Sequence, residues 1–234
     1  MGFVSNKVPV FFVKILKLPI VCTIFGLLSL MFVELDRRAY NSDFFNSSSG
    51  NIEIIKSTSL SKEFIIIGHG FAGSKEMMRQ IAYDIVNAGS NAVLFDFIGH
   101  GSNQQKLINQ PAEITGTTQQ LVTQLSNIIN FIYEKFGDEI NISLIGHSMA
   151  SDIVVRASAD KRIKSAVAIS PYSTGITQDF PKDLLLISGQ FESHLRSHAL
   201  QMVKTFKPKA NENTEYTNGN IRRKASFIEN TGHV

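Results

Sequence analysis

"INISLIGHSMAS", residues 140–151, joins an apolar run to a turn of small residues and then to a segment that favours a helix. The run from Ile140 to Ile145 is typical of a buried strand. The turn after it fits the pattern Gly-x-Ser-x-Gly, except that Ala150 takes the last position, where the requirement is a small side chain. A serine on such a bend presents its hydroxyl for nucleophilic attack. Ser148 is therefore the first candidate functional residue, and a plain turn serine is the alternative reading.

Apolar runs and helical segments alternate on both sides of this stretch. Strands are predicted at residues 64–68, 92–97, 140–145, 166–169, 184–188 and 225–228, and helices at 75–88, 149–159 and 193–206. A further helix is predicted where Leu121, Leu125, Ile128 and Ile132 recur on one face, and Gly137 can end it. Continuous apolar strands separated by amphipathic helices predict an α/β fold, with a mostly parallel central sheet and helices on both faces.

The loops that follow the predicted strands carry the unusual residues. In such a sheet, function gathers at the carboxyl ends of the strands. The loops at this edge are residues 68–75 (GHGFAGSK), 96–102 (DFIGHGS), 146–150 (GHSMA), 189–192 (GQFE) and 231–233 (TGH). The first nearly spells a phosphate-binding loop, but Ser74 precedes Lys75, whereas that motif needs the lysine first. This reversed order disfavours nucleotide binding.

From Glu53 to Val234 the chain resembles the α/β-hydrolase family. The motifs that carry the resemblance are HGF at 69–71, DFIGHGSN at 96–103, GHSMA at 146–150, GQFE at 189–192 and GH at 232–233. The resemblance implies a catalytic triad in which Ser148 is the nucleophile, Glu192 the acid and His233 the general base. It also implies an oxyanion hole made by the backbone N–H groups of Phe71 and Met149. The family more often has Asp at the acid position.

Other polar residues of these loops are expected to serve the structure. The resemblance makes His69, His100 and His147 structural hydrogen bonders. Asp96 is expected to fix its own loop through bonds to backbone groups. Asp152, one turn into the helix after the serine, is expected to point away from the bend.

The reaction predicted by this resemblance is that of a serine hydrolase acting on a carboxylic ester, with no metal or organic cofactor. Only fourteen residues, 170–183, separate two predicted strands where many relatives insert a lid. We therefore expect no sizeable lid and an open, shallow site that favours short or medium acyl groups. Thioesters and amides remain open, since the same triad serves them. A non-catalytic binding or scaffold domain is the alternative, because the sequence ends one residue after His233, where relatives continue with a further helix.

The N-terminal segment is predicted to be a membrane anchor. Leu18 to Val33 contains no charged residue, and flanking lysines can extend the apolar span toward the roughly 20 residues that cross a bilayer. A cleaved signal peptide is the rival, although no small-x-small cleavage site follows. The predicted organisation is an anchor at residues 1–38, a linker at 39–52 and a hydrolase domain at 53–234. Three lysines before the span and two arginines after it favour a cytoplasmic N-terminus, hence a domain outside the cytoplasm.

Charge and cysteine content exclude other classes. Residues 1–38 hold five basic and two acidic side chains, which is the whole net charge of +3. The remainder is neutral, so no nucleic-acid partner is expected. Cys22, in the apolar run, is the only cysteine, so a disulfide framework and a cysteine-based metal site are excluded. The expected partners are a small acyl substrate and the membrane.

Overall fold

The computed structural model describes residues 10–108 and 114–233, and the chain divides into two compact units. The first unit, residues 1–41, contains helix α1 (Val10–Arg38). Its part from Leu18 to Arg38 has a mean hydropathy of 2.2 and is long and apolar enough to cross a membrane. The apolar side chains of this part are exposed, as a membrane anchor or a signal sequence would require.

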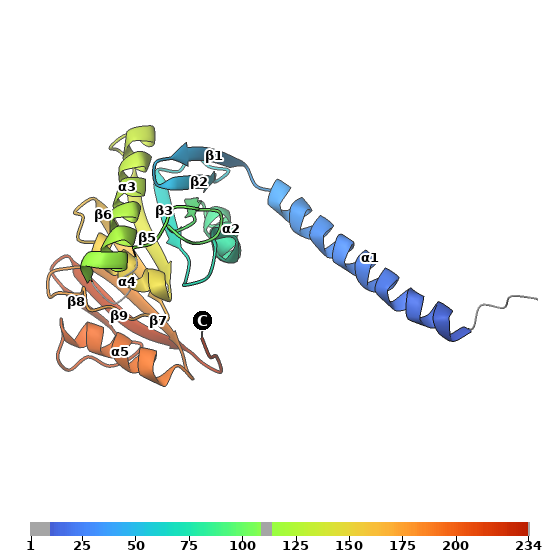
Figure 1. The fold of residues 1–234 in the computed structure, drawn as a ribbon. Helices are drawn as coiled ribbons and strands as arrows, with labels where there is room; N and C mark the ends of the chain where they lie inside the picture. The colour runs from blue at the N-terminus through green and yellow to red at the C-terminus, as the bar shows by residue number, and fades with distance from the viewer. Residues whose placement is uncertain (1–9, 109–113, 234) are drawn as a thin grey trace, which may run out of the picture. The chain divides into compact units, whose positions relative to one another are not determined.

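The second unit, residues 42–234, is built on one twisted sheet (Figure 1). In the described part of the chain nine strands follow the order β1-β2-β4-β3-β5-β6-β7-β9-β8. The strands β3 to β7 and β9 run parallel to their neighbours in this set, and β1, β2 and β8 are antiparallel additions at the two edges. The strands are β1 (Ser42–Ser47), β2 (Gly50–Ile55), β3 (Glu63–Gly68), β4 (Asn91–Phe95), β5 (Asn141–His147), β6 (Ile163–Ile169), β7 (Asp183–Gly189), β8 (Glu215–Asn218) and β9 (Ile221–Ile228).

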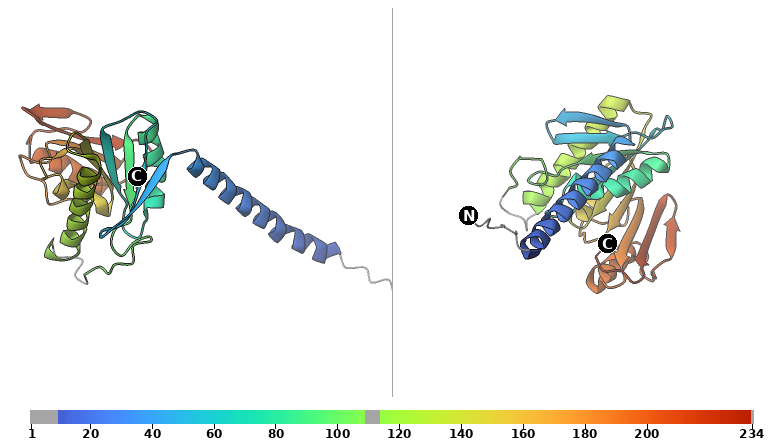
Figure 2. Two further views of the ribbon diagram at one scale, coloured as in Figure 1. Left: turned by 90° about the horizontal axis from the view of Figure 1, so that it is seen from above. Right: turned by 90° about the vertical axis from the view of Figure 1, so that its right-hand side faces the viewer.

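Helices cover both faces of the sheet, as predicted (Figure 2). Three of them, α3 (Gln119–Phe136), α4 (Met149–Ala157) and α5 (Ser193–Lys204), share two core clusters with strand residues of one face. Helix α2 (Arg79–Asn87), which continues from a 3₁₀ turn at Lys75–Met78, contacts β2 and β4. Because successive strand side chains alternate between faces, the buried Ile55 and Leu94 face α2, whereas Ile54 and Val93 lie in the cluster of α3 and α4.

The apolar face of α3 anchors this helix to the sheet. Leu121, Leu125, Ile128 and Ile132, the residues whose spacing predicts the helix, are all buried in the core cluster. Full burial of each such side chain stabilises the fold by about 1.5–3 kcal/mol. The helix ends where predicted, because Gly137 adopts a φ of +85° and donates its N–H to the carbonyl of Tyr133. No helix lies between β6 and β7, residues 170–182, so the expected absence of a sizeable lid there is confirmed.

The predicted linker at residues 39–52 is wrong, because most of it is a β-hairpin. β1 and β2 pair from Ser42 with Ile55 to Ser47 with Gly50, and β2 then pairs with β4. The composition is polar because β1 is an edge strand whose side chains are mostly exposed or half-buried. The structural boundary therefore falls at residues 41/42 and not at 52/53. A second polar stretch, within residues 211–220, similarly supplies the edge strand β8, and β9 begins at Ile221, earlier than predicted.

A buried ion pair ties this hairpin to α2. The carboxylate of Glu53, which is fully buried on β2, accepts two hydrogen bonds of 2.8 and 2.9 Å from the guanidinium of Arg79. Arg79 also donates to Glu76, and Lys75 Nζ lies 3.8 Å from Glu53 Oε2. Burial alone would lower the pKa of Arg79, but these hydrogen bonds to carboxylates outweigh it and hold the pKa above its usual value.

We expect Arg79→Met to destabilise the fold strongly. The substitution keeps an apolar stem but leaves the buried Glu53 carboxylate without its bidentate partner, which costs about 3–5 kcal/mol in such pairs. Urea unfolding of the detergent-solubilised chain measures the effect. The double variant Glu53→Gln, Arg79→Met removes the stranded charge and should recover part of the loss. If the single variant unfolds at the wild-type urea concentration, the pair does not hold the hairpin in place.

Candidate active site

Ser148 occupies a strained turn between β5 and α4. Its backbone has φ +52° and ψ −114°, a region that residues other than glycine rarely adopt. The Ser148 N–H donates to the carbonyl of Ile169 at 2.9 Å, which ties the turn to the end of β6. The turn is possible because Gly146 has no side chain: a Cβ there would lie 2.3 Å from the carbonyl oxygen of Ala150. The chain thus bends sharply enough to expose the serine at the carboxyl edge of the sheet.

The structure explains why alanine is tolerated at the last position of the turn motif. Ala150 is fully buried, and its methyl group points toward Gly68 at the end of β3. A Cβ on Gly68 would lie 2.9 Å from the Ala150 Cβ, closer than real Cβ contacts. The space for the extra methyl is therefore supplied by a glycine on a neighbouring strand.

The loop after β3 lies directly against the Ser148 turn. A Cβ on Gly70 would lie 3.2 Å from the Ser148 Cβ and 3.0 Å from the His147 Nδ1, so the backbone approaches closely here. His69 holds this loop: its Nε2 accepts a bond from the Phe97 N–H at 3.1 Å, so its Nδ1 carries the proton and donates to the Gly70 carbonyl at 2.8 Å. Burial lowers the pKa of His69, which keeps the ring neutral. The predicted structural role of His69 is confirmed.

Asp96 fastens the loop after β3 to the loop after β4. Its carboxylate accepts the N–H of Lys75 at 2.8 Å and the N–H and hydroxyl of Ser102 at 2.9 and 2.7 Å. Burial alone would raise the pKa of Asp96, but these hydrogen bonds outweigh it and hold the pKa below its usual value. Its carboxylate fixes loops, as the sequence predicts. His100 behaves similarly, with Nδ1 2.9 Å from the Ile98 carbonyl oxygen.

Glu192 and His233 meet at the same edge of the sheet. His233 Nδ1 lies 2.5 Å from Glu192 Oε1, while Glu192 Oε2 accepts the Gly189 N–H at 2.7 Å and the Ser170 hydroxyl at 3.1 Å. The Glu192 side chain is almost buried, and that of His233 is about half exposed. The His233 ring centroid lies 5.1 Å from that of His147, the residue before Ser148. The structure therefore brings the predicted base and acid together, beside the serine turn.

The segment that carries His233 is held by the turn after β7. The Gln190 N–H donates to the carbonyl of Ile228 and the Phe191 N–H to that of Thr231, both at 2.9 Å. The carbonyl of Gly232 crosses over Gly189 so closely that a Cβ on Gly189 would lie 1.8 Å from it. Glycine at position 189 is thus required for the segment to reach Glu192.

A cavity of about 670 Å³ opens at Ser148. It is larger than the shallow site that the missing lid predicts, because the loop after β4 and the start of α3 build a wall beside it. Phe71 and Met149, the predicted oxyanion residues, line it together with Ser148. The remaining lining residues combine aliphatic side chains with polar ones: Leu107, Ile108, Leu121, Ile153 and Leu195, and His100, Thr117, Thr118, Asp152, Ser170 and Tyr172.

One of these lining residues departs from a sequence-based expectation, and another was not singled out by the sequence. Asp152 faces the cavity and does not point away from it, because α4 begins directly at the serine turn. Its carboxylate accepts the Ser173 hydroxyl at 2.5 Å and both of its oxygens lie 3.0 Å from Arg156 Nε. Ser170, at a φ of +49°, both lines the cavity and binds Glu192. It belongs to no motif, and its position directly after the predicted strand at 166–169 is the one sequence signal that could have identified it.

Comparisons with known proteins agree with this architecture. A family model described as alpha/beta hydrolase fold matches residues 63–225. A search of curated protein sequences gave no match.

Solved structures with the same fold include enzymes. A serine hydrolase without a lid from Xanthomonas campestris is 13% identical, with 83% of this chain and 85% of that chain covered and a TM-score of 0.58. For a dienelactone hydrolase from Anabaena variabilis the identity is 14%, the coverage 83% and 88%, and the TM-score 0.61. For an esterase from Pyrococcus furiosus the identity is 16%, the coverage 83% and 82%, and the TM-score 0.60. At these identities the likeness shows the fold alone.

A double-mutant cycle should reveal the contact between Ala150 and Gly68. We expect Gly68→Ala to destabilise the fold by about 1–3 kcal/mol, as overpacking does. Ala150→Gly alone should cost about 1 kcal/mol, since it places glycine in a helix. Together the two changes should cost less than their sum, because the new methyl occupies the vacated space. Urea unfolding measures all four proteins. Strict additivity would show that the two positions do not compete for one space.

Proposed function

The chain belongs to the α/β hydrolase fold family, and we propose that it is a serine hydrolase that cleaves a carboxylic ester or a related acyl bond. The observation that carries the proposal is the hydrogen bond between His233 and Glu192, made beside a strained serine turn that opens into an apolar cavity. A serine, a histidine and a carboxylate are the groups that acyl transfer through an acyl-enzyme uses.

Ser148 is the proposed nucleophile and His233 the proposed general base. An ionised carboxylate only accepts hydrogen bonds, so the proton between Glu192 and His233 belongs to Nδ1. The lone pair of the imidazole is then on Nε2, the atom that must take the Ser148 proton as the hydroxyl attacks the acyl carbon. Glu192 orients the ring and stabilises the imidazolium that forms. Gly189 and Ser170 hold the carboxylate for this task through its second oxygen.

The backbone N–H groups of Phe71 and Met149 are the proposed oxyanion hole. Met149 is the first residue of α4, where the helix dipole also favours negative charge. Gly70 brings the loop of Phe71 against Ser148. Each such donor contributes about 2.7–4 kcal/mol to the stabilisation of the transition state. After the alcohol leaves, His233 activates a water molecule that attacks the acyl-enzyme, and the same two N–H groups stabilise the second oxyanion.

The cavity favours esters with a neutral, apolar acyl group. Leucine, isoleucine, methionine and phenylalanine make up half of its lining residues, and its volume of about 670 Å³ lies within the usual range for small-molecule sites. Asp152 is the one acidic or basic side chain, histidine aside, among its described lining residues, and Arg156 pairs with it. Among the described lining residues an anionic acyl group would find no unpaired lysine or arginine to replace its water.

A fluorophosphonate probe tests the proposed chemistry. We expect it to label the wild-type protein at Ser148 and to leave Ser148→Ala unlabelled. Glu192→Gln should be labelled far more slowly, because a neutral amide no longer keeps the proton of His233 on Nδ1. The corresponding change in serine proteases lowers turnover by about 10⁴-fold. We expect a smaller loss here, because the longer glutamate stem positions the ring less tightly. Equal labelling of wild type and Ser148→Ala would reject the nucleophile and favour a binding or scaffold domain.

We also propose that α1 is a retained single-pass anchor, with the hydrolase domain outside the cytoplasm. Its exposed apolar stretch at Leu18–Arg38 supports this reading. We expect the full chain to stay in the membrane fraction through alkaline carbonate washing and to keep its N-terminus, as read by mass spectrometry. A protein that begins at Ser42, the first residue of β1, should be soluble and still labelled by the probe. A mature protein that lacks residues 1–38 would instead identify a cleaved signal.

A further inference from the structure

We propose that Gln120 is a specificity-determining positioning residue, which holds residues 106–108, the acyl strap, as the wall that sets acyl chain length. This inference rests on the proposed function, because it names the part of the same site that selects the substrate. The acyl strap belongs to the segment between β4 and α3, and its residues Leu107 and Ile108 line the cavity that opens at Ser148.

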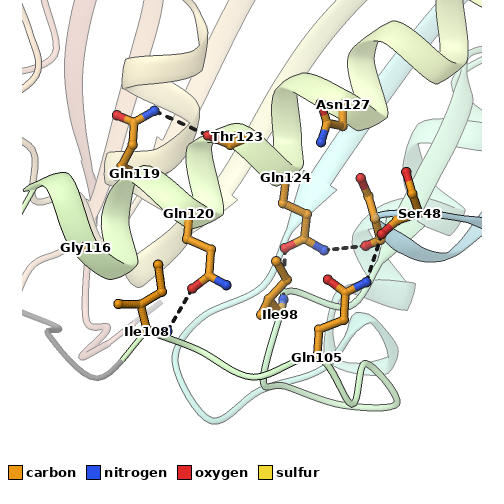
Figure 3. Close-up of a pocket in the computed structure, with 11 residues that line it drawn as sticks. Ser48, Ile98, Gln105, Ile108, Gly116, Gln119, Gln120, Thr123, Gln124 and Asn127 are labelled. Carbon is orange, nitrogen blue, oxygen red and sulfur yellow. Dashed lines mark hydrogen bonds between the residues drawn. The ribbon is translucent and has the colours of Figure 1, made fainter.

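The carboxamide of Gln120 binds the acyl strap at two points. Its Oε1 accepts the Ile108 N–H at 2.9 Å, and its Nε2 donates to the Lys106 carbonyl at 3.0 Å. Figure 3 shows the first of these bonds, with Gln120 reaching down from α3 toward Ile108. A carboxamide suits this role because it offers one acceptor and two donors. A glutamate would keep the acceptor but lose the donor, and an apolar side chain would lose both.

Two further contacts fix the strap between these bonds. The Thr117 hydroxyl donates to the Ile108 carbonyl at 2.7 Å, so Ile108 is bound on both its N–H and its C=O. Leu107 rests on Gly99, where a Cβ would lie 2.8 Å from the Leu107 Cγ. Hydrogen bonds thus determine the path of the backbone, and packing determines where the Leu107 side chain stands.

The acyl strap separates two cavities of opposite character. On one side lies the apolar cavity at Ser148. On the other lies a smaller one, of about 320 Å³, which Ile108 also lines. Carboxamides and hydroxyls dominate this second cavity (Figure 3), among them Gln105, whose Nε2 donates to the Ser48 carbonyl at 2.8 Å. This bond joins Gln105, the residue before the strap, to the turn of the β1–β2 hairpin. The polar residues around this second cavity therefore hold the strap in place, and the strap forms the wall of the apolar cavity.

The position of this wall limits the acyl group that fits. The side chains of Leu107 and Ile108 form one side of the cavity. The strap that carries them has no regular secondary structure. Among the described contacts, the strap without Gln120 keeps the Thr117 bond to Ile108 and the packing of Leu107 against Gly99 and the core. The wall should then yield to longer acyl chains, while the machinery at Ser148 stays in place.

The test compares Gln120→Met with a matched control, Gln119→Met, on the same helix. Gln119 donates to Thr123 of its own helix at 3.4 Å, and among the described residues it makes no hydrogen bond to the strap. The substrates are p-nitrophenyl esters from acetate to decanoate. We expect Gln120→Met to change the ratio of kcat/KM between its longest and shortest substrates by about tenfold or more, mainly through KM. Turnover of the acetate should stay within about twofold of wild type. Gln120→Glu, which keeps the bond from Ile108 alone, should fall between.

Two readouts that do not need catalysis separate this inference from the proposed function. Hydrogen exchange at the Ile108 amide should quicken by about fivefold or more in Gln120→Met, because its acceptor is lost. In a Ser148→Ala background, the binding of neutral n-alkyl methyl ketones, followed by NMR, should show the same altered length preference.

Each outcome bears on the inference in one direction. Faster exchange with an unchanged length preference overturns it and leaves the proposed function standing. An identical shift in Gln119→Met also overturns it, since the effect would then be general to the helix. If the wild type neither cleaves an ester nor reacts with the fluorophosphonate, the proposed function fails. The ketone series then decides alone: a shifted preference supports the strap as the wall of an apolar binding site, and an unshifted one rejects it.

Discussion

The contact between the backbone of Gly146 and the carbonyl of Ala150 is the constraint on which the site depends. Only a residue without a Cβ allows α4 to start so close to the end of β5. That closeness forces Ser148 into its left-handed conformation, and it leaves the helix N-terminus, with Met149, at the same point. One steric condition therefore aligns a hydroxyl, a backbone donor and a helix dipole, which would otherwise need separate positioning.

Around this turn, hydrogen bonds from buried polar side chains join the loops at the carboxyl edge of the sheet. Asp96 joins the loops after β3 and β4, and His69 joins the same pair through Gly70 and Phe97. Neither group touches Ser148 in a bond of its own, yet both fix the loop that carries Phe71. Buried polar groups of this kind are worth most when every member has a partner, because an unpaired one would pay its full desolvation cost.

Most of the sheet could be predicted from the sequence, because buried parallel strands such as β3 and β7 are continuous apolar runs. The hairpin β1–β2 and the edge strand β8 could not, since edge strands face water and have a polar composition. The loops after the strands identified Glu192 and His233 by motif. Gln120 and Ser170 belong to no motif: glutamine and serine are common on surfaces, and only the path of the folded chain brings Gln120 to the backbone of Ile108 and Ser170 to the carboxylate of Glu192.

The order of strands in the sheet also governs when the site can form during synthesis. β2 pairs with β4 and not with β3, so the β1–β2 hairpin can join the sheet only after both β3 and β4 have been synthesised. β7, which leads to Glu192, waits in the same way for β9, which leads to His233. Such non-local pairings delay folding relative to local ones. A nascent chain thus carries Ser148 well before the segment with His233 is made, and the bond between Glu192 and His233 cannot form until the last parallel strand docks.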